Sequence, residues 1–425
     1  MKNFNDMKVL LVGNGGRESA LAWKIAQSPN LSHLYISPGN AGTQQFGLNL
    51  NYRDSEIEKL LEFAINNQID LTVVGPEVPL DLGIVDLFKE NGLKIFGPSK
   101  ICAQIESSKS FAKQIMQKRN IPTADSKLFT NPKEAYEYVE DFSGPLVVKA
   151  DGLAAGKGVF VCANKSESKN AINELMEQKI FGSSGESILI EQLLTGWEAS
   201  AFVFCDGNSF SSLIAACDHK RIGEGDTGPN TGGMGAFSPP ANWDEQIEQN
   251  VLENIVTPMI DEMKINYVPY VGVLFIGLMI NEEGPKVIEF NCRLGDPESQ
   301  VILPLMQSDI LDVMLSCING DIQKNNVQWS SESSVGVVIA SGGYPKDYNV
   351  GFEIKGLDTT DNLVNIFHAG AELDHMGNTI TSGGRVLTVN SVADTMSVAI
   401  KKCYENLDRI QFEDSYYRRD IGTNI

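Results

Sequence analysis

The feature that most constrains the fold is a strict alternation of short apolar runs and amphipathic stretches over the first hundred residues. The apolar runs have the length of strands, and the stretches between them carry apolar residues at helical spacing. Strands that are joined by helices pair in parallel and form a doubly wound sheet. The sequence therefore predicts a Rossmann-like domain with strands at 8–12, 33–37, 71–75 and 93–97 and helices at 17–27, 55–67 and 80–91.

Beyond residue 107 the pattern changes to short apolar runs that are separated by glycine-rich loops, which is typical of an α+β arrangement. We expect strands at 146–149, 159–161, 188–190, 199–204, 213–216, 272–280 and 286–290, and helices near 107–119, 166–178 and 244–264. After Trp329, antiparallel strands are expected at 335–340, 364–368 and 384–389, with a closing helix at 391–407. The predicted fold class is thus a multidomain α/β and α+β protein with domains 1–107, 108–328 and 329–425.

Charge and cysteine content exclude some classes of partner. The 425 residues include 34 basic and 55 acidic side chains, a net charge of −21, which argues against a nucleic-acid partner. The seven cysteines are odd in number and contain no C-x-x-C pair, which favours a reducing compartment. No segment has the length and apolarity of a membrane span. We expect a cytoplasmic protein that binds small molecules.

The first glycine turn, Gly13 to Glu18, follows a strand and opens a helix. Backbone amides at a helix N-terminus favour an anion, so phosphate or sugar-phosphate binding is expected here, although a plain tight turn would have the same pattern. A nicotinamide dinucleotide is disfavoured because Glu18 stands where the third glycine of G-x-G-x-x-G belongs, and no acidic residue ends the second strand.

Two further loops, Pro38 to Gly42 and Gly75 to Glu77, follow the second and third predicted strands. Loops at the carboxyl ends of parallel strands line the ligand crevice of such a sheet, although each loop alone is typical of an ordinary turn. Together with the first glycine turn, they could enclose one small ligand.

The stretch from Lys149 to Gly158 carries glycines and lysines between two predicted strands. It does not match a Walker P-loop, because Gly158 stands where Ser or Thr is required. We interpret it as a glycine-rich flap whose amides and Lys157 cover a polyphosphate, with Lys149 reaching the same phosphates. A second glycine-rich loop, Thr227 to Gly235, follows Lys220 and Arg221 and suits another anionic ligand.

A candidate metal site lies on the predicted strand 287–293. Its period of two places Glu289, Asn291 and Arg293 on one face, with Ile288, Phe290 and Cys292 turned toward the core. Carboxylate and amide oxygens two residues apart suit Mg²⁺, and Arg293 could neutralise a phosphoryl or carboxylate charge beside the metal. A strand with one solvated face would have the same pattern.

These motifs together resemble the glycinamide ribonucleotide synthetase family of the ATP-grasp superfamily. The resemblance extends from Lys8 to about Gly422 and is carried by GNGGRE (13–18), SPGNAGT (37–43), VGPEVPL (74–80), KIFGPS (94–99), VVKADGLAAGKGV (147–159), DHKRIGEGDTGPNTGGMGAFSP (218–239), VIEFNCRLGDPE (287–298), SGGYP (341–345), FHAG (367–370) and SGGRVL (382–387). It implies an ATP-grasp core with a small lid at about 124–193.

The resemblance also implies a reaction in de novo purine synthesis. ATP, glycine and 5-phospho-β-D-ribosylamine would give glycinamide ribonucleotide, ADP and phosphate through glycyl phosphate, with Mg²⁺ or Mn²⁺ and without a protein nucleophile. We expect a monomer or a weak dimer. The resemblance implies catalytic roles for Arg293 and Lys149 and a metal site at Glu289 and Asn291.

The remaining implied positions fall into two sets. The ATP-binding set, including the adenine-reading hinge after the strand at 188–190 and the ribose acceptor Glu198, is Lys109, Lys149, Gly156, Lys157, Gly158, Glu191, Gln192, Leu194 and Glu198. The substrate-binding set is Gly15, Gly16, Arg17, Glu18, Gly39, Asn40, Ala41, Glu77, Asp218, Lys220, Asn230, Thr231, Gly232 and Arg293.

The sequence departs from the family pattern at Ser19, where His is expected, and at Gln192, where a second Glu is common. Three alternatives stay open at this point. They are an ATP-grasp ligase with a different acid or amine, a nucleotide-binding regulatory protein without turnover, and a nicotinamide oxidoreductase.

Overall fold

The N-terminal strands form a five-stranded parallel sheet in the computed structural model, which describes residues 6–154, 157–324 and 327–423. The strand order β3-β2-β1-β4-β5 places β1 at the centre, as expected for a doubly wound domain. The elements are β1 (Met7–Gly13), α1 (Gly16–Ile25), β2 (Leu31–Pro38), η1 (Thr43–Gln45), β3 (Leu48–Asn49), α2 (Ile57–Asn66), β4 (Leu71–Val74), α3 (Glu77–Leu82), α4 (Ile84–Glu90), β5 (Ile95–Phe96) and α5 (Lys100–Ser107).

One expected helix of this domain is divided. The predicted helix at 80–91 is two helices, α3 and α4, which meet at Gly83. Gly83 has φ +95°, a left-handed conformation that ends a right-handed helix and that glycine adopts without steric cost. The last predicted strand also contracts to Ile95–Phe96.

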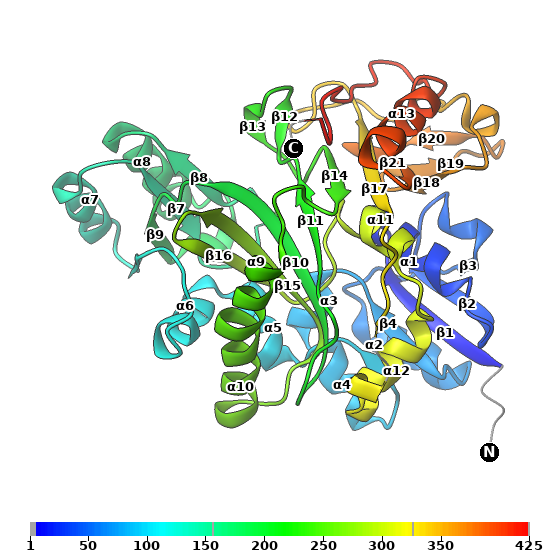
Figure 1. Cartoon of the computed structure of the whole chain (residues 1–425), viewed down its shortest axis with the longest axis horizontal. Coiled ribbons are helices and arrows are strands. Elements are labelled where there is room, and N and C mark those ends of the chain that lie inside the picture. The colour runs from blue at the N-terminus through cyan, green and yellow to red at the C-terminus, as the bar shows by residue number, and fades with distance from the viewer. Residues whose placement is uncertain (1–5, 155–156, 325–326, 424–425) are drawn as a thin grey trace.

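A separate four-stranded sheet lies at one end of the molecule, on the left in Figure 1. Its strand order is β6-β9-β7-β8, and every pairing is antiparallel. The sheet packs against two helices through a hydrophobic cluster of its own, which includes Val148, Ile172 and Ile190. The elements are β6 (Ser126–Phe129), α7 (Pro132–Asp141), β7 (Leu146–Ala150), β8 (Val159–Cys162), α8 (Lys165–Ile172), η2 (Asn173–Glu177), η3 (Gly182–Gly185) and β9 (Ile188–Gln192). This unit falls within the range expected for the lid.

The central sheet has eight antiparallel strands in the order β16-β15-β10-β11-β14-β17-β21-β18. The pairing of β14 with β17 joins the middle of the chain to its last hundred residues, so the sheet runs through the boundary that we expected at 328/329. The strands are β10 (Trp197–Asp206), β11 (Ile214–Asp218), β14 (Gly235–Ser238), β15 (Val271–Asn281), β16 (Gly284–Asn291), β17 (Ser333–Ala340), β18 (Val364–His368) and β21 (Arg385–Ala393).

The expected closing helix begins later than predicted. Ser391 is 1% exposed and pairs with both Val335 and Val364, so it belongs to β21, and the helix begins only at Met396. Pairing on both edges of the strand outweighs the local helical pattern here. Two small hairpins were not predicted. The remaining elements are α6 (Lys109–Lys118), β12 (Arg221–Gly223), β13 (Thr227–Asn230), α9 (Glu245–Val251), η4 (Leu252–Val256), α10 (Thr257–Asn266), α11 (Ser299–Ile302), η5 (Leu303–Leu305), α12 (Ile310–Asn319), η6 (Ile322–Lys324), η7 (Leu357–Thr359), β19 (Ala371–Leu373), β20 (Thr379–Thr381) and α13 (Met396–Leu407).

The architecture confirms the predicted fold class, with one parallel sheet and antiparallel sheets in the rest of the chain. The helices of the described residues are all too short or too polar to cross a bilayer. Near the end of the described chain, Asp420 Oδ2 accepts from Gly225 N in the β12–β13 hairpin at 2.8 Å, near the centre of Figure 1.

Candidate functional site

A β-bulge shapes the strand that carries the expected metal ligands. In the pairing of β16 with β15, Glu289 faces Gly277 and Val287 faces Leu278, so Ile288 is the extra residue. As a result Val287 and Phe290 both reach the core, whereas Ile288, which we expected there, is only half-buried. Bulges of this kind re-aim backbone and side chains and are frequent beside active sites. Here the carbonyl of Ile288 accepts a hydrogen bond from Lys149 Nζ at 3.1 Å.

Four cationic side chains gather around Glu289 at the end of β16. Burial opposes ionisation of this carboxylate, but the charges of Lys220, Lys149, Lys109 and Arg293 outweigh burial and lower its pKa. Glu289 is therefore a carboxylate at neutral pH despite its half-buried position. We call these residues the cationic end of β16. Because they come from four different segments, only the tertiary fold brings them together.

The side chain of Glu191 lies between two buried lysines, and its predicted role in ATP binding stays a prediction. Its Oε2 is 2.7 Å from Lys149 Nζ and its Oε1 is 3.2 Å from Lys113 Nζ. All three side chains are less than 10% exposed. Burial lowers the pKa of Lys113, whereas the charge of Glu191 raises it. The Glu191 side chain thus holds Lys149 in place. Lys113 was missed in the sequence, where only its spacing of four residues from Lys109 could have suggested it.

Asn291 meets the requirement for a metal ligand on chemical grounds. It is 7% exposed, and its Nδ2 is buried without a hydrogen-bond partner among the described residues. The Nδ2 group is a hydrogen-bond donor that an acceptor oxygen of a ligand would satisfy, whereas the amide Oδ1 is the atom that can bind a cation. The described residues contain no cluster of three His, Cys, Asp or Glu side chains that could hold a metal alone. Glu289 and Asn291 therefore fit a hard cation that takes its other oxygen ligands from a bound phosphate or water.

The glycine-rich flap joins β7 to β8 in the lid. Lys157 is exposed, and Gly158 accepts the backbone bond that closes the hairpin at Ala150. Gly156 lies outside the described residues. The base of the flap is tied to the start of α6, because Lys109 Nζ donates to Gly152 O at 3.0 Å and Asp151 accepts from Ser110 N and Oγ. Of the two lysines predicted to bind ATP, Lys109 therefore lies at the base of the flap and Lys157 lies on the flap.

The other predicted ATP-binding residues lie along β9 and β10. Gln192 ends β9 with its side chain exposed, and Leu194 is half-buried in the following turn. Glu198 Oε2 pairs with Lys220 Nζ at 2.8 Å, and both side chains are partly exposed. Burial lowers the pKa of Lys220, but the nearby carboxylates of Glu198, Glu289 and Asp218 raise it above its ordinary value. Lys220 therefore stays protonated between β10 and the end of β16.

The first glycine turn is filled by the glutamate that follows it. Glu18 is 1% exposed, and its Oε2 accepts from Gly15 N at 2.6 Å. A Cβ on Gly13 would lie 2.6 Å from Glu18 Cγ, and one on Gly75 would collide with the Glu18 carboxylate. We expected Glu18 to interfere with close packing, but these glycines make room for it. Arg17 Nε completes the arrangement by donating to Glu18 Oε1 at 2.5 Å.

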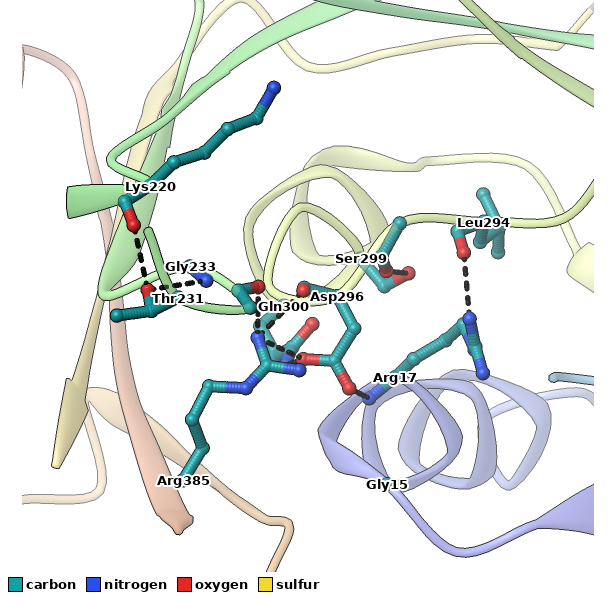
Figure 2. Close-up of polar contacts among 12 residues, drawn as sticks. Gly15, Arg17, Lys220, Thr231, Gly233, Leu294, Asp296, Ser299, Gln300 and Arg385 are labelled. Carbon is teal, nitrogen blue, oxygen red and sulfur yellow. Dashed lines mark hydrogen bonds and ion pairs between the residues drawn. The ribbon is translucent and has the colours of Figure 1, made fainter. Parts of the chain in front are cut away.

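Asp296 lies at the N-terminus of α1, where we expected a phosphate. Its Oδ2 accepts from Arg17 N at 3.2 Å, and Figure 2 shows the carboxylate between the end of α1 and Arg385. Arg385 Nη1 donates to Asp296 O at 2.7 Å and lies 3.3 Å from its Oδ1, while Gln300 Nε2 donates to the same oxygen. Burial opposes ionisation of Asp296, but Arg385 and Arg17 lower its pKa. Three parts of the chain therefore meet at one ionised carboxylate.

The loop at Gly39 to Ala41 is held by hydrogen bonds within the protein. Asn40 Nδ2 donates to Asn14 O and His368 O, both at 2.8 Å, and its Oδ1 accepts from Gly42 N and Thr43 N. The amides of Gly39 and Ala41 donate to Gly13 O and Ala371 O. Asn40 thus joins the first two glycine loops to the C-terminal strands. Its predicted contact with substrate stays a prediction.

The glycine-rich loop that ends at Gly235 is held by two residues from the C-terminal part of the chain, Arg385 and Tyr344. Thr231 Oγ1 donates to Lys220 O at 2.8 Å, and Arg385 Nη1 donates to Gly232 O at 2.6 Å (Figure 2). Tyr344 OH accepts from Gly232 N at 2.9 Å. Asn230 ends β13, where it pairs with Arg221. We call the turns at 13–18, 39–42 and 227–235 the glycine-loop side of the site.

Asp218 lies beside this loop with one oxygen unsatisfied. Its Oδ1 is buried without a hydrogen-bond partner among the described residues, and a Cβ on Gly233 would lie 2.6 Å from that oxygen. Burial and the negative charge of Glu298 raise the pKa of Asp218 well above its ordinary value. The side chain can therefore hold a proton or receive a donor from a ligand.

Arg293 connects the two sides. Its Nε is 3.2 Å from Glu77 Oε2, and Arg17 Nη1 lies 4.0 Å from the same oxygen. Burial opposes ionisation of Glu77, but Arg293 and Arg17 lower its pKa. A cavity of about 10 Å³ that borders Arg293 and Gly75 can hold at most one water molecule, so it is not the substrate pocket.

Sequence reasoning missed several residues that organise this site, because their roles depend on partners far away in the chain. Arg385 lies in the SGGRVL motif and Asp296 in the LGDPE segment, but neither was assigned a role. Their positions within matching motifs were the only available signal. Tyr344, in SGGYP, was missed for the same reason.

Three family models match successive parts of the chain. They are the N domain of phosphoribosylglycinamide synthetase over residues 7–106, its ATP-grasp (A) domain over 107–299 and its C domain over 334–424. Together they span nearly the whole sequence, in the order of the synthetase.

Several relatives have similar sequences over nearly the whole of this chain. The phosphoribosylamine–glycine ligase of Caldanaerobacter subterraneus is 45% identical over 98% of this chain and 99% of its own length. The ligase of Salmonella typhi is 46% identical over 98% of each chain. The trifunctional purine biosynthetic protein adenosine-3 of Gallus gallus is 46% identical over 98% of this chain but only 42% of its own length.

Solved structures agree with the sequence matches. The crystal structure of phosphoribosylamine–glycine ligase from Thermotoga maritima superposes with a TM-score of 0.85 at 32% identity, covering 97% of this chain and all of that one. A biotin carboxylase from Campylobacter jejuni, with a TM-score of 0.74 at 15% identity over 98% of this chain and 94% of that one, shares the fold. The motifs, the ATP-grasp architecture and these full-length matches together show that the chain belongs to the phosphoribosylglycinamide synthetase family.

Proposed function

We propose that the protein ligates glycine to 5-phospho-β-D-ribosylamine with ATP, giving glycinamide ribonucleotide, ADP and phosphate. The observation that carries the proposal is the convergence of Lys109, Lys149, Lys220 and Arg293 on Glu289, next to the glycine-loop side. Full-length similarity to enzymes named phosphoribosylamine–glycine ligase supports the same reaction. The convergence suits phosphoryl transfer, because catalysis of that step is largely positioning and charge neutralisation.

The reaction would proceed in two steps. The glycine carboxylate attacks the γ-phosphorus of ATP, so that ADP leaves and glycyl phosphate forms. The ribosylamine nitrogen then attacks the acyl carbon, and the C–O bond to phosphate breaks. No protein nucleophile is required. Lys149, held by Glu191, and Lys109, beneath the flap, would bind the ATP phosphates, and Arg293 would stabilise the charge on the transferring phosphoryl group and on glycyl phosphate.

Glu289 and Asn291 would hold Mg²⁺ or Mn²⁺. When bound, the cation supplies charge neutralisation and orientation of the phosphates. The pKa of Glu289, lowered by its cationic neighbours, keeps the carboxylate ready for this role at neutral pH. The amide Oδ1 of Asn291 would be the second oxygen ligand, and its unpartnered Nδ2 would donate to an oxygen of the bound substrate.

The lid would exclude water from the acyl phosphate, since such an intermediate hydrolyses when water enters. The lid has its own hydrophobic core and is tied to β16 by the bond from Lys149 Nζ to Ile288 O. The phosphoribosylamine would be surrounded by residues of the glycine-loop side, namely Gly15, Gly16, Arg17, Glu18, Gly39, Asn40, Ala41, Asn230, Thr231 and Gly232. Glu77, Asp218 and Lys220 would complete its surroundings.

We also propose a cytoplasmic location and a monomer that forms at most a weak dimer. The location is supported by the seven cysteines, which are all free thiols. The three-domain division at 107 and 328 remains part of the proposal, with the central sheet shared between the second and third domains.

The decisive experiment measures phosphate release from ATP with Mg²⁺, with and without glycine and freshly made phosphoribosylamine. Release that requires both acceptors, with the ribonucleotide product seen by mass spectrometry, is the expected result. Release with a different acid or amine would keep the ATP-grasp chemistry and reject the proposed substrates. Folded protein that releases no phosphate with any acceptor would reject the ligase activity.

A further inference from the structure

A buried glutamate outside the predicted site, Glu106, binds the two residues that follow β16. Glu106 is 8% exposed and lies on α5, which ends the N-terminal domain. Its Oε2 accepts from Cys292 N at 2.8 Å and from Cys292 Sγ at 3.1 Å, and its Oε1 is 2.8 Å from Arg293 Nη2. One carboxylate thus binds the backbone amide and the thiol of Cys292 and the guanidinium of Arg293.

The Arg293 guanidinium is held on its other side as well. Nε pairs with Glu77 Oε2 at 3.2 Å, and Nη1 donates to Leu294 O at 3.3 Å. The carbonyl of Leu294 also accepts from Arg17 Nη1 at 3.1 Å, the contact drawn in Figure 2. A planar guanidinium with partners on several edges has little freedom to rotate. Glu106 and Glu77, from two segments of the N-terminal domain, therefore fix the direction of an arginine that lies two residues beyond the end of β16.

Glu106 also lies close in the chain to the ATP-facing lysine. It is followed by Ser107 and by Ser108, whose side chain caps α6, and α6 begins at Lys109. A shift of Glu106 would move the end of β16 relative to the start of α6, because the carboxylate is bonded to the amide next to Asn291. Small displacements of reacting groups cost large factors in rate.

We propose that Glu106 is a positioning residue that acts through Arg293 and the backbone of Cys292, holding the arginine in the direction needed for phosphoryl transfer. This inference rests on the proposed function. It assigns Glu106 no contact with substrate. A merely structural glutamate would affect unfolding without changing the turnover of the folded enzyme, so kinetics and stability separate the two roles.

The test compares Glu106→Gln in the wild-type enzyme and in an Arg293→Lys background, with folding checked by circular dichroism and thermal unfolding. The amide keeps the size of the side chain and one acceptor oxygen but loses the charge that pairs with Arg293. We expect kcat to fall about 10–100-fold with the KM for ATP nearly unchanged. In the Arg293→Lys background, whose guanidinium is already gone, the same substitution should lower kcat less than about 3-fold.

The matched control is Glu262→Gln on α10. Glu262 is also buried, and it pairs with Lys118 Nζ at 2.6 Å and Asn266 Nδ2 at 3.0 Å, away from the site. We expect that control to lower the melting temperature and to leave kcat unchanged.

Wild-type enzyme without glycine- and phosphoribosylamine-dependent turnover would reject the proposed function itself. Active wild-type enzyme with an unchanged Glu106→Gln kcat, or with equal losses in both backgrounds, would overturn the positioning role alone. If Glu106→Gln does not fold, Glu106→Asp takes its place in the same comparison. Failure of both variants to fold would assign Glu106 to stability and would also overturn the proposal.

Discussion

The cationic end of β16 and the glycine-loop side are built from different groups, charged side chains on the first and backbone turns on the second. At the cationic end of β16, ionised side chains face one another, and Glu289 and the Asn291 amide are left available for a ligand. On the glycine-loop side, turns of the backbone lie close together, and polar side chains such as Asn40 and Glu18 are consumed by hydrogen bonds within the protein. The first side therefore depends on charge, and the second depends on shape.

This difference teaches how substitutions should be interpreted. Removing a charge at the end of β16 should affect turnover more than stability, because in the proposed mechanism the charges there bind the ATP phosphates. Removing a side chain on the glycine-loop side should affect stability as well, because it leaves buried backbone groups without partners. Four predictions test this contrast, from the largest expected effect to the smallest.

The largest effect is expected for Glu289→Gln, which keeps the shape of the side chain but removes the anionic ligand. Because charge neutralisation by a bound cation is worth several kcal/mol, kcat should fall about 10²–10⁴-fold while unfolding stays cooperative. Steady-state ligation assays with varied Mg²⁺ measure the effect. The control is Glu283→Gln, an exposed carboxylate on the same hairpin. Activity of Glu289→Gln within a few-fold of wild type would show that the charge of Glu289 is not needed for turnover.

Lys149→Ala should weaken the use of ATP. Its removal takes away both the charge near Glu289 and the bond to Ile288 O across the lid boundary. We expect kcat/KM for ATP to fall about 10–10²-fold, with less effect on the KM for phosphoribosylamine. The comparison variant is Lys401→Ala, an exposed lysine on α13. An unchanged dependence on ATP would remove Lys149 from the site.

Asn40→Ala should act mainly on stability. The carbonyls of Asn14 and His368 would lose their donor, so the free energy of unfolding should fall by about 2 kcal/mol in urea titrations. The KM for phosphoribosylamine should rise severalfold, whereas the KM for ATP should not change. The exposed Asn91→Ala serves as the control. A rise in the KM for ATP alone would contradict the separation of the two sides.

The smallest effect concerns pH. Burial lowers the pKa of His368 to about 4, whereas an unfolded histidine titrates near 6.5. Between these values the unfolded chain binds the proton first, so the free energy of unfolding should decrease as the pH falls below about 6.5. From pH 7 to pH 5 the contribution of His368 should be about 1–2 kcal/mol.

Urea unfolding at several pH values checks this prediction. His368→Phe should flatten the dependence on pH, and the exposed His375→Gln should leave it unchanged. An identical slope in His368→Phe would show that another group causes the loss at low pH. A weaker dependence of unfolding free energy on pH in His368→Phe would support the importance of packing between the N-terminal and C-terminal segments for the glycine-loop side. The backbone of His368 also binds Ser19 and Asn40 from the N-terminal segment.

Much of the fold was predictable from local pattern. The alternation of strands and helices predicted the parallel sheet, and the period of two on residues 289–293 placed Glu289 and Asn291 together on one face of β16. Local pattern failed where long-range pairing decided the outcome. The bulge at Ile288 depends on the register with β15, and Ser391 to Ala393 extend β21 because β17 and β18 pair with that strand.

The sequence alone determined the fold class, the glycine turns, the pairing of a carboxylate (Glu289) with an amide (Asn291) on one strand and the family resemblance, because each depends on residue types at short spacing. The tertiary structure alone decided which charges meet. Three sets of contacts join residues from about forty to nearly three hundred positions apart in the chain. They are the ion pairs of Glu191 with Lys113 and Lys149, the bonds of Asp296 to Arg17 and Arg385, and the ion pair of Glu106 with Arg293. Charge–charge energies depend on distance and burial in space, so a one-dimensional pattern cannot contain them.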